Sequence, residues 1–336
     1  MPVGTVTTLL ATPRKTLLYV KQLAASSDCS TVYVVDGGNH RVQQVDVATG
    51  DLSPVAGSGQ GKNEDGVGAA ASFCAPYGLA RSTEHGQTVL YVSEVHGHSI
   101  RQITVGADGT GTVSTLAGSA GSCPGTHGST DGMGTAARFF GPWDAAVRTT
   151  RSGAKILYVA DRFNGLLRAV QLDGSQRGLV STVHRANGYG YVTACPDFVF
   201  FASDRARGGG MGVYKLDPST GDTTPATLLA ADSSFKGYGT GAIAASADCE
   251  TVYVGETWGH RVRQVDVSSH AVTTLAGSGA NGASDGRGAS ATFSKHMTGM
   301  ATCGATLYLA HAVLGDQMER IRAVAIPGPV AARRGG

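Results

Sequence analysis

The stretch TVYVVDGGNHRVQQVDV, residues 31–47, decides the fold. It joins an apolar strand that ends in an acid to a short polar turn and a second strand with period-two alternation. A near copy, TVYVGETWGHRVRQVDV, occupies residues 251–267. The same phrase recurs through the chain, and its copies share an aromatic residue in the first strand: Tyr33, Tyr91, Tyr158, Phe201, Tyr253 and Tyr308. Recurrence of this kind indicates a repeat architecture.

Two more strands complete each unit. A short apolar strand such as GLA (78–80) precedes the phrase, and a strand reading VTTLAG (272–277) or a variant of it follows. Four antiparallel strands repeated six times predict an all-β, six-bladed β-propeller. The expected blades are 20–57, 77–118, 143–184, 191–230, 241–277 and 298–326, with 327–336 as a linker or tail.

The last unit stops after its third strand, near Ile326. The missing strand is expected at 5–11, because VTTLLA (6–11) nearly copies VTTLAG (272–277). Closure of the sixth blade by the N-terminal strand would remove the open edge between the first and last blades.

Composition agrees with many short strands joined by tight turns. The 336 residues include 49 glycines, and only 15% are charged, against a usual ~25%. A 41% hydrophobic content supports a core, so coiled coils, helical bundles and disordered chains are excluded. Net charge is +2, which makes nucleic acid an unlikely partner, and no apolar run reaches the ~20 residues of a membrane helix.

The chain resembles the NHL-repeat family of six-bladed propellers. Asn39-His40-Arg41 and the weaker Gly259-His260-Arg261 carry the resemblance, together with the glycine-rich segment from Leu275 to Phe293. The resemblance covers nearly the whole chain and implies the propeller fold. It implies function less closely, since such propellers serve as adhesion or sensing ectodomains, scaffolds, RNA binders and, in relatives, enzymes.

Three loops between blades share the pattern D-G-x-G-x-x-A-x-F. One interpretation is a glycine nest for phosphate or a cation site. The other is a tight turn whose Asp caps backbone groups and whose Phe plugs the space between blades. Three matching copies favour the second interpretation. The copies are Asp65 to Phe73, Asp131 to Phe139 and Asp285 to Phe293.

Acids at the ends of the second strands are candidates for a metal or acid/base site, or for ion pairs with arginines of the next strand. Acid and Arg recur together, which favours ion pairs: Asp36, Glu94, Asp161, Asp204 and Glu256, with His311 in the sixth place. His40, His98 and His260 occupy equivalent places on separate blades, too far apart to share one metal ion. We therefore expect no metal, no cofactor and no catalytic residue.

Six cysteines are present and none forms a C-x-x-C pair. Cys74 and Cys123 lie in long loops at successive junctions and are the only disulfide candidate. Symmetry is expected to keep Cys29, Cys195, Cys249 and Cys303 apart. A bridge would favour an oxidising compartment. The sequence leaves localisation and oligomeric state open, with a cell-surface ectodomain slightly favoured.

The loops between the second and third strands and the loops between blades are expected on one face of the propeller, the long-loop face, which carries every long loop. The mouth of the central channel on this face is the candidate site. Its expected ligand-binding residues are Lys21, Tyr77, Trp143, Asp144, Tyr189, Tyr191 and Tyr238. These side chains either form a recognition surface or plug the channel. We expect a non-enzymatic module that binds a protein, peptide or glycan. The alternatives are a metal-dependent lyase or hydrolase with a channel site, and an RNA-binding NHL domain.

Overall fold

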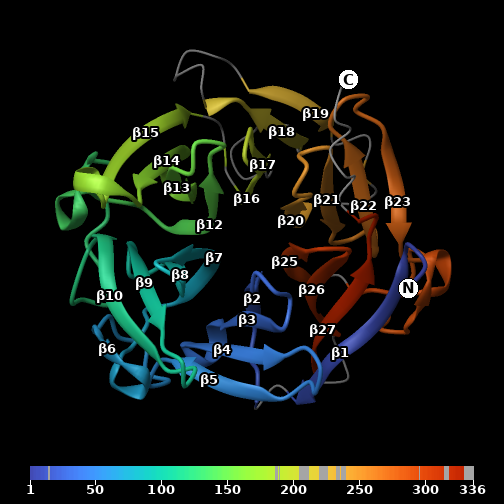
Figure 1. Cartoon of the computed structure of the whole chain (residues 1–336), viewed down its shortest axis with the longest axis horizontal. Coiled ribbons are helices and arrows are strands. Elements are labelled where there is room, and N and C mark those ends of the chain that lie inside the picture. Colours follow the sequence, from blue (N-terminus) through green and yellow to red (C-terminus); the bar gives the residue numbers. More distant parts are fainter. Residues whose placement is uncertain are drawn as a thin grey trace.

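A computed structural model describes residues 1–13, 16–185, 188, 190–203, 212–218, 226–231, 235, 240–294, 296–313 and 318–328. Six antiparallel sheets surround a central axis, which confirms the six-bladed propeller (Figure 1). No helix among these residues has the length and hydrophobicity of a membrane span. The helical segments described are single 3₁₀ turns: η1 (Gly37–Asn39), η2 (Gly68–Ala70), η3 (Gly134–Ala136), η4 (Arg162–Asn164), η5 (Gly174–Gln176) and η9 (Gly288–Ser290).

Each blade begins with an inner strand that lines the axis. From inside to outside, blade 1 contains β2 (Val20–Ala25), β3 (Thr31–Asp36), β4 (Arg41–Asp46) and β5 (Leu52–Ala56). Blade 2 contains β7 (Pro76–Glu84), β8 (Gln87–Glu94), β9 (Ser99–Val105) and β10 (Gly111–Gly118). Blade 3 contains β12 (Pro142–Thr149), β13 (Lys155–Asp161), β14 (Leu166–Gln171) and β15 (Leu179–Arg185).

Blades 4 to 6 follow the same order. Blade 4 contains β16 (Tyr191–Ala194), β17 (Val199–Ser203), β18 (Gly212–Leu216) and β19 (Thr227–Ala231). Blade 5 contains β20 (Thr240–Ala245), β21 (Thr251–Glu256), β22 (Arg261–Asp266) and β23 (Val272–Ala276). Blade 6 contains β25 (His296–Cys303), β26 (Thr306–Val313), β27 (Met318–Ala325) and β1 (Thr5–Pro13). Two-residue strands add a fifth member to three blades: β6 (Gly66–Val67), β11 (Gly132–Met133) and β24 (Gly286–Arg287).

The N-terminal strand closes the ring, as the sequence predicts. β1 pairs antiparallel with β27, from Val6 opposite Val324 to Pro13 opposite Met318. The two strands lie side by side in Figure 1, with the first part of the chain in blue and the last in red. The observed strand extends two residues beyond the expected end at residue 11.

The apolar runs form the core between blades. In β3 every residue after Thr31 is buried, because the second strand is covered by the blades on both sides. One cluster joins Val35 and Val42 of blade 1 to Leu90 and Ile103 of blade 2. Each sheet is therefore stable only against its neighbours, as in other repeat proteins.

The three Asp-Gly loops fasten neighbouring blades through a buried arginine. Arg168 has no exposed surface, and its guanidinium contacts Asp161 at 3.0 Å and Asp131 at 2.7 Å. Asp131 also accepts hydrogen bonds from the backbone N–H and hydroxyl of Thr182, both at 3.0 Å. The guanidinium lies 5.1 Å from the ring centre of Phe139, which is fully buried. This confirms the structural interpretation of the motif.

Three disulfides join the cysteines, which corrects the expectation of a single pair. Cys74–Cys123 is present, with Cα atoms 5.6 Å apart. Cys29–Cys303 joins blade 1 to blade 6, and Cys195–Cys249 joins blade 4 to blade 5. The sequence argument compared cysteines at the same place of different blades. The real partners lie at different places of adjacent blades, where one β-hairpin turn meets the neighbouring inner strand.

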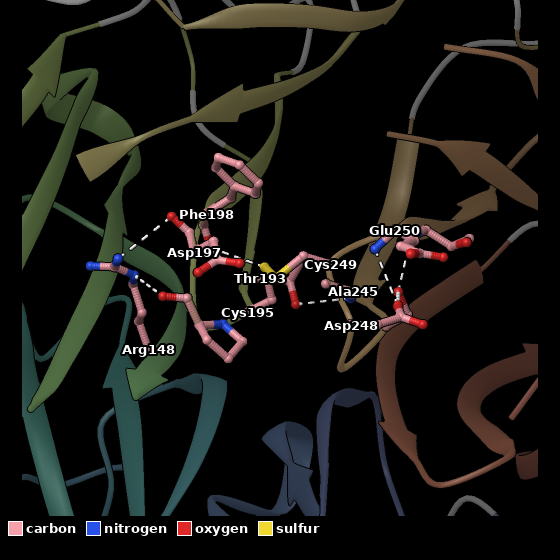
Figure 2. The surroundings of a disulfide bond; sticks show 12 residues. Arg148, Thr193, Cys195, Asp197, Phe198, Ala245, Asp248, Cys249 and Glu250 are labelled. Carbon is pink, nitrogen blue, oxygen red and sulfur yellow. Dashed lines mark hydrogen bonds between the residues drawn. A yellow bond between two sulfur atoms is a disulfide. The ribbon is translucent and has the colours of Figure 1, made fainter. Parts of the chain in front are cut away.

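Figure 2 shows how the Cys195–Cys249 bridge sits among contacts that join three blades. Arg148 of blade 3 donates to the backbone carbonyl of Pro196 at 3.0 Å. The Ala245 N–H of blade 5 donates to the Thr193 hydroxyl at 3.2 Å. The disulfide therefore lies where noncovalent contacts already hold adjacent blades together.

The disulfide pattern predicts that unreduced, denatured protein has no reactive thiol, as measured with a thiol-specific dye. Replacement of both Cys195 and Cys249 by Ser should lower the free energy of unfolding by about 2–5 kcal/mol, measured by denaturant titration. Four reactive thiols in the unreduced protein would instead support the single bridge expected from sequence.

Candidate functional site

The inner strands change register where they begin, at the channel mouth. Shifts typical of β-bulges interrupt pairing at the start of β2, β7, β12, β20 and β25. Bulges redirect side chains and are frequent beside active sites. The mouth therefore has two layers of equivalent positions. The outer layer holds Lys21, Tyr77, Trp143, Gly190, Gly241 and Thr298, and the inner layer holds Gln22, Gly78, Asp144, Tyr191, Ala242 and Gly299.

A cation–aromatic stack occupies one side of the outer layer. The rings of Tyr77 and Trp143 have centroids 4.0 Å apart. The Nζ atom of Lys21 lies 4.9 Å from the Tyr77 centroid, and the Arg162 guanidinium lies 4.0 Å from the Trp143 ring. Each cation gains from the negative face of its ring. The structure thus brings together Lys21, Tyr77 and Trp143 as the sequence predicts, and adds Arg162 from η4.

Asp144 lies in the layer below and is fully buried. Its carboxylate accepts a hydrogen bond from the Gln22 amide at 3.0 Å and another from the Val192 N–H at 3.1 Å. Gln22 in turn accepts from the Met300 N–H of blade 6 at 2.9 Å. One carboxyl therefore connects groups from several blades across the axis.

Gly78 is the residue of blade 2 that lies between Gln22 of blade 1 and Asp144 of blade 3, and its lack of a side chain leaves room for their hydrogen bond. A Cβ atom at position 78 would lie 2.6 Å from the Asp144 Cα and 2.5 Å from the Ser93 hydroxyl. Real Cβ atoms essentially never lie within 3.0 Å of such neighbouring atoms. Only glycine therefore fits between Gln22 and Asp144.

Burial controls the ionisation of the site. Loss of solvent raises the pKa of Asp144 to about 7, although hydrogen bonds from Gln22, Val192 and Ala145 oppose the increase. Burial also raises the pKa of Tyr77 and Tyr191, whose side chains are hydrogen-bonded to each other. Burial lowers the pKa of Lys21, and the negative charge of Glu319 partly offsets this decrease. The site thus holds a carboxyl that ionises near neutral pH beside two tyrosine hydroxyls.

Trp143 supplies a further polar group. Its indole N–H is buried and lies beside the Tyr191 hydroxyl, whose pKa it lowers as a hydrogen-bond donor. The contact falls outside strict hydrogen-bond geometry. The N–H is therefore weakly held and is a candidate donor to an oxygen atom of a ligand.

Two of the candidate residues cannot be placed, and two contributors were missed. Tyr189 and Tyr238 lie outside the described residues, as does Asp204. Gln22 and Arg162 were not among the candidates. Gln22 had a signal in the sequence, because it stands where other blades have Gly78, Ala242 or Gly299. Arg162 stands in η4 at the place that Gly37 takes in η1, so the repeat positioned its backbone but did not show that its side chain reaches Trp143.

The acids at the second-strand ends serve as ion pairs and turn caps in the described blades. Glu94 pairs with Arg101 at 3.2 Å, and Glu256 with Arg263 at 3.4 Å. His311 takes the acid's place in blade 6, where burial lowers its pKa to about 3. Over the described residues, no three His, Cys, Asp or Glu side chains gather in a way that could hold a metal ion.

Comparison with solved structures supports the fold at very low identity. Neither a protein-family model nor a curated protein sequence matches the chain. Similar structures include the PQQ-bound aldose sugar dehydrogenase of Streptomyces coelicolor (14% identity, 97% of this chain and 99% of that chain, TM-score 0.59). A gluconolactonase from Xanthomonas campestris is 10% identical over 96% and 89% of the two chains, with a TM-score of 0.57. Regucalcin, a calcium-binding protein from Agrobacterium tumefaciens, is 13% identical over 97% and 95%, also at 0.57.

These comparisons correct the expected function. The structural neighbours are mostly enzymes, among them a sugar dehydrogenase and gluconolactonases, so the expectation of a non-enzymatic recognition module is wrong. They agree better with the enzyme alternative. At these identities they establish a propeller shared with gluconolactonase-like proteins. They do not establish membership of the NHL family, and the chemistry must be argued from the residues of the chain.

The raised pKa of Asp144 predicts a pH-dependent loss of stability. The folded protein retains the Asp144 proton up to about pH 7, whereas the unfolded chain releases it near ~4. The stabilising contribution is therefore complete below about pH 4 and declines as pH rises toward 7, by roughly 4 kcal/mol in total. Chemical denaturation at pH 4.5 and pH 8 should show a smaller decline for Asp144→Asn than for the wild type. Equal declines in the two proteins would show that Asp144 has an ordinary pKa.

Proposed function

We propose that the chain is a propeller hydrolase that opens lactones or related esters at the channel mouth on its long-loop face. The observation that carries the proposal is the buried Asp144 carboxyl, whose pKa of about 7 suits general acid–base catalysis at neutral pH. The gluconolactonase among the structural neighbours supports the same substrate class, since its activity is a lactone hydrolysis by name.

The proposed reaction uses Asp144 twice. The Asp144 carboxylate accepts a proton from a water molecule while the water oxygen bonds to the carbonyl carbon. The carbonyl oxygen becomes negative and accepts a hydrogen bond from the Trp143 N–H, which turns to it from the Tyr191 hydroxyl. The bond between the carbon and the ring oxygen then breaks, and the proton on Asp144 passes to that oxygen. The product is a hydroxy acid.

Access to Asp144 requires the aromatic stack to move. The carboxyl has no exposed surface, whereas Tyr77 and Trp143 above it are only partly buried. Outward rotation of these two rings would admit a substrate, and Lys21 and Arg162 would then lie beside the forming negative charge. Closure over the substrate would exclude water other than the attacking molecule.

The residues present favour hydrolysis over a cofactor-dependent dehydrogenation. Calcium and PQQ are named for two of the neighbours. Here the described residues offer no group of three metal-binding side chains. Trp143 is already in contact with the Tyr77 ring and the Arg162 guanidinium, so a planar cofactor would have to displace one of them to stack on it. We therefore assign no step to either group.

Membership of the NHL-repeat family remains part of the proposal and is supported by Asn39-His40-Arg41. Three disulfides support an oxidising working environment, because such bonds persist mainly outside the cytosol.

A panel of sugar lactones and simple esters, followed by pH-stat titration, tests the proposal. We expect hydrolysis whose kcat/KM rises with pH up to about 7, as Asp144 loses its proton. Asp144→Asn should lower kcat by about 100-fold or more, because general-base catalysis contributes ~10²–10⁴-fold. Asp51→Asn, in an exposed hairpin turn, is the control and should retain activity.

Two results would contradict the hydrolase. One is activity that Asp144→Asn leaves unchanged. The other is oxidation of an aldose, with an added electron acceptor, by protein that hydrolyses no lactone. Melting curves of both variants at pH 7 separate lost catalysis from lost folding, since Asp144→Asn loses one of the two accepted hydrogen bonds but also removes a buried carboxyl.

A further inference from the structure

A polar cavity of about 560 Å³ lies between blades 2 and 3, apart from the channel mouth. Two departures from the repeat build it. The β7–β8 hairpin is longer than its counterpart in blade 1, and its turn contributes Glu84, His85 and Gln87. The β14–β15 connection contains η5 and contributes Asp173 and Arg177. The size falls in the range of small-molecule sites, ~300–1,000 Å³.

A fixed hydrogen-bond network forms the wall of the cavity. The Arg177 guanidinium contacts Glu84 at 3.1 Å, donates to the Gln102 side-chain oxygen at 2.6 Å and donates to the Tyr91 hydroxyl at 3.3 Å. The Tyr91 hydroxyl also donates to Glu84. Tyr91 is fully buried, and burial raises its pKa. These residues come from both blades, so the network holds the cavity open in one arrangement.

The charges of the wall are already balanced. Glu84 is engaged by Arg177 and Tyr91, so it offers little to a cation. Arg177 uses its terminal nitrogens on protein oxygens, so it offers little to an anion. Lys155 donates to the Thr83 carbonyl at 2.5 Å, and the Asp173 carboxylate accepts a hydrogen bond from the Lys155 backbone N–H. The lining thus holds two basic side chains, Lys155 and Arg177, and two acidic ones, Glu84 and Asp173, so these charges sum to zero and favour neither a cation nor an anion.

The remaining groups suit hydroxyl-rich molecules. The side chains of Gln87, Gln102 and Thr104 line the cavity and offer both donors and acceptors. Val89 and Leu172 also border the cavity, but both are almost fully buried in the core, so the polar groups provide the contacts for a ligand. We propose that this cavity is a second binding site, for a neutral mono- or disaccharide. The proposal stands independently of the hydrolase activity.

The test is saccharide titration by calorimetry, with variants that fill equivalent places in two inter-blade cavities. Thr104→Trp fills the proposed site. Gln171→Trp is the matched control, because Gln171 occupies the same strand position in blade 3 and lines a smaller cavity between blades 3 and 4. We expect one neutral saccharide per chain, at least tenfold weaker binding to Thr104→Trp, and unchanged binding to Gln171→Trp. Gln87→Ala, an exposed change that should leave folding intact, should weaken binding about threefold to tenfold.

Several results would overturn the proposal. These are no binding of any neutral saccharide up to about 10 mM, tighter binding of uronic acids or amino sugars than of neutral sugars, and equal loss of binding in both tryptophan variants. Binding that Thr104→Trp leaves intact but that Trp143→Ala removes would place the sugar at the channel mouth. Melting curves of each variant exclude loss of folding as the cause.

Discussion

A buried guanidinium between two carboxylates is the interaction on which the ring depends. In blades 2 and 3 an arginine of the third strand contacts the acid that ends the second strand and the aspartate of the preceding Asp-Gly loop. Removal of the arginine would leave the fully buried Glu94 or Asp161 without its cation, which costs about 3–5 kcal/mol. The same aspartate caps the outer strand, and the nearby phenylalanine fills the space between blades. One ionic cluster thus fixes the loop, the sheet edge and the packing of the neighbouring blade.

Variation on this repeat produces the candidate site. The layer of small residues that closes the channel in other blades is replaced by Gln22, Asp144 and Tyr191. These replacements place a carboxyl where water is excluded, and its pKa rises for that reason. A symmetric scaffold therefore creates a chemically distinct centre through side-chain changes at equivalent positions, without a change of backbone topology.

The repeated blade sequence made the fold predictable. The two further disulfides and the raised pKa of Asp144 were not predicted, because they depend on residues that do not repeat. The number of blades, the closing strand and the Asp-Gly loops follow from repeated phrases, because repeated sequence must adopt repeated structure. The Cys74–Cys123 pair followed from an insertion at one junction. The Cys29–Cys303 and Cys195–Cys249 pairs could not be predicted in this way. Each joins non-equivalent positions of adjacent blades, and the order of the blades alone does not give the distance between the two cysteines. Asp144 was a candidate ligand-binding residue from sequence, but its raised pKa was not foreseen. That pKa arises from burial, which one sequence does not display.

The Cys29–Cys303 bridge has a mechanical consequence. It spans 274 positions of the chain and crosses the junction that β1 also closes. A force applied at the two ends of the chain would be carried through this covalent link and would not reach the segments that it encloses. Under tension, extension would be confined to the segments outside the bridge, and β1 would peel from β27 while blades 2 to 5 stay assembled. The covalent loop therefore makes the propeller a load-bearing unit whose interior is shielded from stretching.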